Sequence, residues 1–164
     1  MTEPNWLDLD FMLSLQTELL AKFGGLEGVR EPGLLDSALN RPLHLFAYDT
    51  PTLFALAASY TYGIVKNHPF LDGNKRAGFM AAYTFLGMNG YHLQAPETDA
   101  VLMTVDLAAG KIEPDLYARW LEQHSKRKKR EGEVSWRHVL DEDIRVKGII
   151  AGRISAESSD SLTR

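Results

Sequence analysis

The residues best suited to chemistry lie in one short stretch, from His68 to Gly78, which reads HPFLDGNKRAG. Pro69 must end the helix before it, because proline restricts the preceding residue and has no backbone N–H to continue the ladder. Residues 72–74 (Asp-Gly-Asn) have turn chemistry, and a second helix is expected to begin near Asn74. The stretch therefore predicts a turn between two helices.

Lys75 and Arg76 place two cations in the first turn of that second helix. A helix N-terminus carries free backbone N–H groups and the positive end of the helix dipole, so cations there are unfavourable and an anion is favourable. A broken local rule of this kind is typical of a functional site. We therefore expect an anion to bind at this helix start, with a polyphosphate as the obvious candidate.

Two neighbouring side chains add the groups that phosphoryl or nucleotidyl transfer needs. Asp72 beside bound phosphates would hold Mg²⁺, which prefers one or two carboxylates together with phosphate oxygens. His68, with an ordinary pKa of about 6.5, is a natural general base for a hydroxyl nucleophile. Each residue alone also fits an ordinary structural role, as a surface histidine, a turn or a solvated cation. The grouping within nine residues favours transfer chemistry.

The helices that must position this turn are predicted from the spacing of apolar residues. The first helix has one apolar stripe at intervals of three and four, which indicates one buried face. This stripe consists of Met12, Leu15, Leu19 and Phe23. Asp8 is expected to cap this helix and Gly24-Gly25 to end it.

Five further helices are expected along the chain. They run from Gly33 to Asn40 with Arg41-Pro42 as the stop, from a Thr52 cap to Asn67, from Asn74 to Met88 with Asn89-Gly90 as the stop, from Thr98 to Ala109, and from Pro114 to His124. A strand-like run occurs only around Tyr91-His92-Leu93. The predicted fold class is all-α, with an antiparallel helical core.

The composition is that of an ordinary globular chain of 164 residues, with 45% hydrophobic and 24% charged residues. The count of Cys is 0, which excludes a disulfide framework, a thiolate metal site and a cysteine nucleophile. The first residues lack the basic and apolar regions of a signal peptide, and no apolar run is long enough for a bilayer. We therefore expect a cytoplasmic protein.

The net charge of -4 is unevenly distributed. Residues 1–125 are acidic on balance, which argues against a nucleic-acid binder, and residues 126–164 are basic. The change of sign predicts a domain boundary near Ser125, followed by a partly disordered tail. The basic run at 126–130 is interpreted as a solvated helix end, with a polyanion contact as the alternative. Beyond it, a stripe from Trp136 to Ile144 has helical spacing.

Residues His68 to Arg76 resemble the signature of the Fic/Doc family, H-x-F-x-[DEN]-[GA]-N-[GK]-R, at every defined position. Segments 23–30 (FGGLEGVR) and 32–35 (PGLL) resemble the death-on-curing (Doc) branch of that family. The likeness extends over roughly residues 7 to 124. It implies that residues 1–125 form an all-α Fic-fold catalytic domain that uses ATP and Mg²⁺, with 126–164 as a short extension.

The resemblance also implies a role for each residue of the motif. His68 would deprotonate a hydroxyl on a target protein, and Asp72 would coordinate Mg²⁺. Gly73 would let the backbone approach the phosphates, which Asn74 and Arg76 would bind. Family members also carry a flap that holds the target segment, and the resemblance places it around residues 43–51.

Lys75 decides the expected reaction, because family members that transfer AMP mostly have Gly at that position. A Lys fills the seat of the distal phosphates, and the Doc branch is understood to present the γ-phosphate of an inverted nucleotide. The resemblance therefore favours a protein Ser/Thr kinase. The alternatives are an adenylyltransferase on the same scaffold and an inactive binding module.

Doc-type toxins phosphorylate a threonine of elongation factor Tu and are held silent by a small antitoxin. The resemblance therefore implies two partners for this chain, a translation factor as substrate and a cognate antitoxin. No membrane and no direct nucleic-acid contact are expected.

Overall fold

The computed structural model describes residues 2–128. Within this range the chain forms α1 (Leu9–Phe23), α2 (Pro32–Tyr48), α3 (Leu53–Asn67), α4 (Asn74–Met88), β1 (Tyr91–Leu93), α5 (Glu97–Ala108), α6 (Pro114–Gln123) and β2 (Ser125–Arg127). The all-α prediction is confirmed, with one short two-stranded ribbon added to it. No helix among the described residues is long and apolar enough to cross a membrane.

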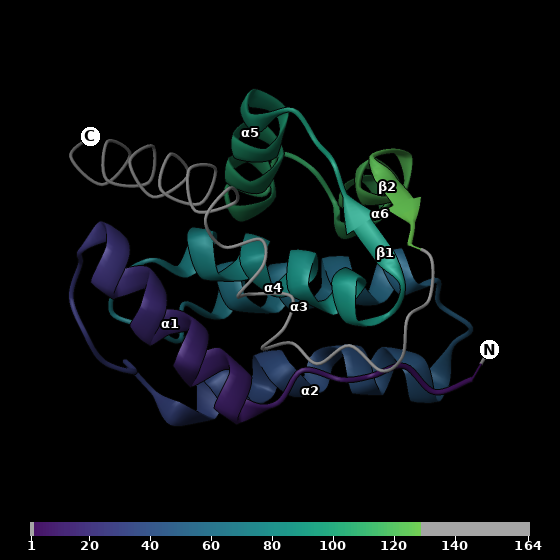
Figure 1. Cartoon of the computed structure of the whole chain (residues 1–164). Coiled ribbons are helices and arrows are strands. Elements are labelled where there is room, and N and C mark those ends of the chain that lie inside the picture. The colour runs from purple at the N-terminus through teal and green to yellow at the C-terminus, as the bar shows by residue number, and fades with distance from the viewer. Residues whose placement is uncertain (1, 129–164) are drawn as a thin grey trace.

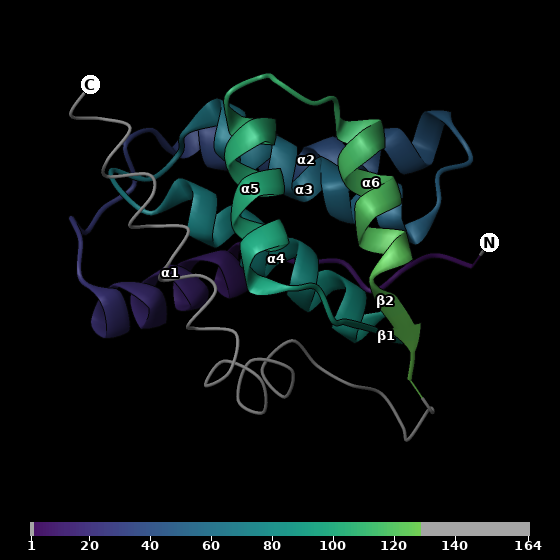
Figure 2. The ribbon, with the colours of Figure 1, turned by 90° about the horizontal axis from the view of Figure 1, so that it is seen from above.

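The helices form three layers around a central pair (Figure 1). α3 and α4 lie in the middle, α1 and α2 cover one side, and α5, α6 and the ribbon cover the other. Figure 2 shows α5 and α6 running across the central pair. The central pair is buried on both faces, as the apolar character of its sequence predicts. The turn that joins α3 to α4 is therefore anchored by the two most enclosed helices of the fold.

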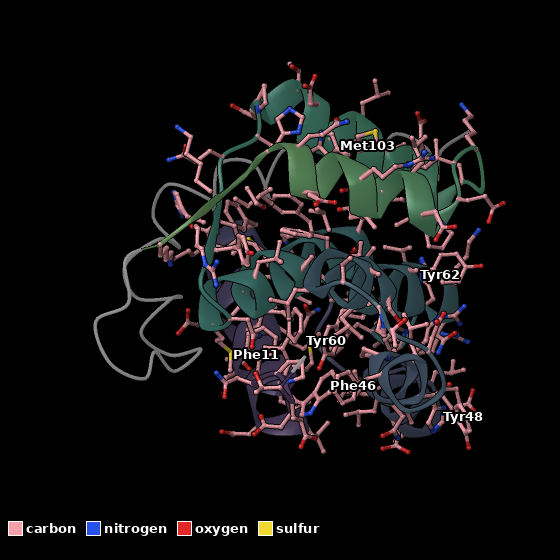
Figure 3. All side chains as sticks on the ribbon, turned by 90° about the vertical axis from the view of Figure 1, so that its right-hand side faces the viewer. Phe11, Phe46, Tyr48, Tyr60, Tyr62 and Met103 are labelled. Carbon is pink, nitrogen blue, oxygen red and sulfur yellow. The ribbon has the colours of Figure 1, made fainter. Side chains whose placement is uncertain are left out.

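The core beneath α3 and α4 is rich in aromatic rings (Figure 3). Phe11 of α1 and Tyr60 of α3 are fully buried there, and Phe46 of α2 packs at its margin against Trp6. Tyr48, by contrast, is 90% exposed and points away from the molecule. The aromatic core holds α1 and α2 against the central pair, and the ends of these two helices flank the motif turn.

Helix α1 begins where the sequence predicts it. The Asp8 carboxylate accepts a hydrogen bond of 2.8 Å from the Phe11 N–H, and Gly24 ends the helix with φ at 73°. Met12, Leu15 and Leu19 are buried as expected. Phe23 departs from the predicted stripe because its ring is 38% exposed. It lies past the core at the motif turn, where its ring covers the Arg76 guanidinium.

Replacing the N-cap of α1 tests how much this cap contributes to the stability of the protein. We expect Asp8→Ala to lower the free energy of unfolding by about 1 kcal/mol, because the Phe11 N–H loses its acceptor at the helix start. Chemical denaturation of the two proteins measures the difference. Glu18→Ala removes an exposed acidic side chain from the same helix but leaves the cap, and it should cost clearly less. Equal losses for the two variants would contradict a capping role for Asp8.

Helix α2 is longer than predicted. It runs through Pro42 to Tyr48, whereas the sequence was expected to end it at Asn40. Proline normally breaks a helix because it lacks the N–H that bonds to the fourth residue back. Here Pro42 is buried, and Leu45 and Phe46 in the next turn pack against the core. Tertiary packing of that last turn outweighs the missing hydrogen bond.

The ribbon corrects the interpretation of the start of the basic run. Lys126 and Arg127 belong to β2, which pairs antiparallel with β1 so that Arg127 faces Tyr91, and they do not form a helix end. A three-residue strand after α6 has no apolar alternation, so only its partner β1 makes it a strand. The stripe from Trp136 to Ile144 and the rest of the tail lie outside the described residues. The predicted boundary near Ser125 remains a prediction.

Candidate active site

The motif turn begins at the C-terminal end of α3, where His68 is the helix cap. His68 has φ 54° and ψ 55°, a left-handed conformation that is costly for a residue with a side chain. Arg30 holds this conformation, since its Nε donates to His68 O and its Nη2 to Asn67 O, both at 2.9 Å. The Asn67 side chain in turn donates to Leu34 O. The backbone beneath the imidazole is thus fixed from the start of α2.

The connection between α1 and α2 lies directly against the motif turn, and the two segments are neighbours at the left of Figure 1. Val29 and Phe70 form an antiparallel bridge. Arg30 N donates to Pro69 O at 2.6 Å, and Leu71 N donates to Gly28 O at 3.1 Å. Phe70 is 1% exposed and anchors the turn in the core. The connection therefore forms backbone contacts with residues 69–71, the first half of the motif turn.

This arrangement corrects the predicted place of a flap. Residues 43–51 form the end of α2 and the approach to α3, so they lie at the N-terminal end of α3. His68 lies at the opposite end of that helix, which has 15 residues and is about 22 Å long. The segment beside the motif turn is instead the glycine-rich connection at 24–31.

The Asn74 side chain closes the turn from within. It is 3% exposed, and its Oδ1 accepts from Phe70 N while its Nδ2 donates to Phe70 O, both at 3.0 Å. These two bonds fix the orientation of the amide. The second N–H of Nδ2 therefore meets His68 Nδ1 at 3.1 Å. The Asn74 side chain thus braces the loop and the histidine, and the phosphate-binding role that the resemblance implies for this residue stays a prediction.

The hydrogen bond with Asn74 determines which nitrogen of the neutral His68 ring carries the proton. Because Nδ1 faces an N–H donor, the neutral ring carries its proton on Nε2. The pKa of His68 is lowered from 6.5, first by loss of water around the ring and then by the nearby cations Lys75 and Arg30. The residue is exposed at the surface, and because its pKa lies below 6.5 the ring is mostly neutral at pH 7. Its one lone pair, on Nδ1, accepts from the Asn74 amide, so a hydroxyl can give its proton to this ring only when that hydrogen bond opens.

Asp72 is half-buried at the tip of the turn. Its Oδ1 accepts from Gly73 N at 2.8 Å and its Oδ2 from Leu26 N at 3.3 Å. Each carboxylate oxygen keeps a second lone-pair site, which is what a metal ligand needs. The described residues contain no group of three or more His, Asp or Glu that would hold a metal by themselves. A cation at Asp72 would therefore need oxygens from a ligand or from water.

Arg76 is unusual because its charged side chain is almost completely buried. It is 1% exposed, and its Nε, Nη1 and Nη2 have no hydrogen-bond partner among the described residues. The Phe23 ring lies 5.3 Å from the guanidinium carbon, and the charge of Asp72 acts on it from the other side. Burial lowers the pKa of Arg76. A buried cation without acceptors is costly, so this group is poised for an anionic ligand.

The start of α4 completes an anion site. Its N-cap is Gly73, which has φ 76° and offers no side chain to cap the helix, and the helical ladder begins with Ala77 N donating to Gly73 O. The positive φ favours glycine here, and a Cβ at this position would lie 2.6 Å from Arg76 Nη2, so a larger residue would displace the guanidinium. Lys75 follows in the same turn, half-buried and with its pKa lowered by burial. The structure thus brings all six predicted residues together.

Three residues that hold the site were not identified from the sequence as part of it. Arg30 fixes the His68 backbone, Phe23 covers the Arg76 guanidinium, and Gln16 of α1 donates from Nε2 to Asp72 O at 2.8 Å. The segment containing Phe23 and Arg30 was noted only as a resemblance. Their contacts join parts of the chain more than 35 residues apart, which spacing along one segment does not reveal.

Comparisons with known proteins agree with this geometry. Residues 6–86 match the Fic/DOC family. The chain is 44% identical over 75 residues to Toxin Doc of Mycolicibacterium smegmatis, a match that covers 44% of this chain and 58% of that protein. It is 32% identical over 103 residues to Protein kinase doc of Escherichia phage P1, which covers 62% of this chain and 80% of that protein.

The chain belongs to the Fic/Doc family. Within the family, both relatives are Doc proteins, so the chain is a member of the Doc branch. The resemblance that the motif from His68 to Arg76 indicated is thereby confirmed. The match to the M. smegmatis toxin spans a little over half of that protein, at 58% of its length.

Proposed function

We propose that the protein is a Doc-like toxin of a toxin–antitoxin module. In this proposal it is an ATP- and Mg²⁺-dependent transferase that phosphorylates a Ser or Thr hydroxyl on a translation protein, namely elongation factor Tu. The observation that carries the proposal is the buried guanidinium of Arg76 at the start of α4, close to His68 and Asp72 in the chain, which has no hydrogen-bond partner among the described residues. The similarity to a protein named Protein kinase doc supports phosphoryl transfer.

The residues present fit a nucleotide bound with Mg²⁺. The Arg76 guanidinium and the start of α4 offer N–H donors to phosphate oxygens, and Lys75 adds positive charge in the same turn. Asp72 offers one carboxylate with free lone pairs, which matches the way Mg²⁺ binds when phosphates complete its shell. When bound, Mg·ATP supplies the phosphoryl group and the charge neutralisation.

The chain's own residues then divide the work. Arg76 and Lys75 hold phosphate oxygens, and Asp72 holds the cation. His68 takes the proton of the target hydroxyl at Nδ1 once the hydroxyl replaces the Asn74 N–H there, and Arg30 keeps the backbone of His68 in place. Positioning and electrostatic stabilisation supply most of the catalysis in phosphoryl transfer, so a rigid turn is what the reaction needs.

Two labelled forms of ATP test the reaction. The protein is incubated with Mg²⁺ and purified elongation factor Tu, and separately with a bacterial translation extract, once with γ-labelled and once with α-labelled ATP. Label on a protein from the γ position only would establish the kinase. Label from the α position would mean AMP transfer and would overturn our interpretation of Lys75.

The same assay distinguishes the remaining alternative and the target. A γ-labelled band other than elongation factor Tu would replace the proposed substrate while keeping the kinase. No His68-dependent label from either ATP, in an extract where an active relative labels its target, would indicate a binding module. The proposed cytoplasmic location and cognate antitoxin are tested by fractionation and by co-purification of a small partner from the source cells.

The lowered pKa of His68 predicts how the transfer rate changes at acid pH. The base works when neutral, so the rate should fall at acid pH with a midpoint below 6.5, the ordinary pKa of a histidine. Arg30→Gln removes a cation that disfavours the protonated ring, so its acid limb should move to higher pH. Arg30→Lys keeps a charge and should move less. An Arg30→Gln limb at lower pH would contradict the electrostatic cause.

A further inference from the structure

Helix α1 contacts the motif turn through the side chain of Gln16. This residue is 5% exposed, and its Nε2 donates to Asp72 O at 2.8 Å. The acceptor is a backbone carbonyl, so the amide orientation is fixed, because the reversed amide would place one oxygen against another. The other end of the amide, Oε1, is buried and has no hydrogen-bond partner among the described residues.

A buried Gln with an unsatisfied oxygen is an unfavourable choice for a helix face in the core. Buried polar atoms are normally paired, and an orphaned acceptor lowers stability. Met12, Leu15 and Leu19 on the same face are fully buried and apolar. An apolar side chain of similar length at position 16 would avoid the orphan. The unsatisfied Oε1 of Gln16 therefore lowers stability, and the favourable contribution of the amide comes from its Nε2–H.

That N–H completes the fixation of Asp72. The Asp72 carboxylate is held by Gly73 N at the start of α4 and by Leu26 N in the connection from α1 to α2. Its backbone carbonyl is held by Gln16. Leu26 is 66% exposed and its neighbour Gly25 has φ 122°, so that support comes from an exposed, irregular segment. Gln16, by contrast, is anchored in the middle of a packed helix.

We propose that Gln16 is a positioning residue that orients Asp72 for the divalent cation. This inference rests on the proposed function, in which Asp72 binds Mg²⁺. The Gln16 N–H fixes the carbonyl of Asp72 and with it the peptide that leads into Gly73. The carboxylate is then presented to the cation at one angle. Partners that orient a metal ligand in this way typically contribute 10- to 100-fold to metal affinity.

Gln16→Met tests the proposal, because methionine keeps the length of the side chain and removes the N–H. Mn²⁺ stands in for Mg²⁺, and its bound fraction is measured by electron paramagnetic resonance with the full chain and a non-hydrolysable ATP analogue. We expect Mn²⁺ to bind about tenfold more weakly than in the unchanged protein. In the transfer assay the KM for Mg²⁺ should rise, while kcat at saturating Mg²⁺ stays near its original value.

A structural role alone would give a different pattern. Gln16→Met removes the orphaned Oε1 but leaves the Asp72 carbonyl without its donor, so we expect its unfolding temperature to stay close to that of the unchanged protein. Gln94→Met makes the same chemical change at an exposed residue just after β1 and should leave Mn²⁺ binding unchanged. Unchanged Mn²⁺ affinity in Gln16→Met would overturn the proposal.

A second pair of variants decides the matter if Gln16→Met fails to fold. Gln16→His places an imidazole N–H at a similar reach and should bind Mn²⁺ within about twofold of the unchanged protein. Gln16→Asn keeps the amide but is one methylene shorter, so it should lose about tenfold. Equal affinities in this pair would overturn the proposal. Failure of the unchanged protein to bind Mn²⁺ with the ATP analogue would instead overturn the proposed function.

Discussion

His68→Ala should lower the rate of transfer to the target hydroxyl by about 10²–10⁴-fold, the range that a general base contributes. The reason is the mostly neutral ring described above, which in the proposed function accepts the proton at Nδ1 when the hydroxyl replaces the Asn74 N–H. Label from γ-labelled ATP on the target measures the rate. Binding of the nucleotide should change little, because in the proposed function the start of α4 and Arg76 hold the phosphates.

The control for this variant must separate chemistry from folding. His68 is exposed, and its left-handed backbone suits glycine better than alanine. His68→Gly should therefore be as inactive as His68→Ala and at least as stable in thermal unfolding. His44→Ala removes an exposed histidine from the distant half of α2 and should retain the full rate. A His68→Ala protein that transfers at the original rate would show that another group is the base.

The sequence was sufficient for the features that depend on local rules. Apolar spacing and capping predicted α1, α3 and α4 with nearly their observed ends, and the motif predicted which residues meet at the turn. Lys75 and Arg76 in the first turn of α4 were noticed because they oppose the helix dipole. The structure agrees with that observation, because the Arg76 guanidinium is buried there without a hydrogen-bond partner among the described residues.

The features that were missed depend on contacts between distant segments. Pro42 stays inside α2 because the core holds the helix on both sides of it, and β2 is a strand only because β1 lies beside it. The contacts of the Asn74 side chain could not be predicted for the same reason, and its role as a phosphate ligand stays a prediction. Its type and place suit a phosphate ligand, but its burial and the bonds to Phe70 and His68 direct it inward.

Arg76→Met should abolish nucleotide binding and, at the same time, stabilise the protein without nucleotide. The guanidinium is buried and has no acceptor in the part of the chain that the structure describes. An apolar side chain of similar length removes this buried charge, which we expect to raise the free energy of unfolding by about 1–3 kcal/mol. The unchanged protein should gain about 2.7 kcal/mol from Mg·ATP at 100 times its Kd. Arg76→Met should gain almost nothing at the same concentration. Denaturation with and without Mg·ATP measures both effects.

The opposite signs of the two effects are what make this variant decisive. A purely structural arginine would lose stability on replacement, and its loss would not depend on nucleotide. Arg76→Lys keeps the charge without the fork of donors, so its gain from Mg·ATP should fall between those of the other two proteins. Arg41→Met removes an arginine that covers the Tyr62 ring on α3, and it should leave the gain intact. Stabilisation by Mg·ATP that persists in Arg76→Met would mean that the phosphates bind elsewhere, and the anion site at the start of α4 would have to be abandoned.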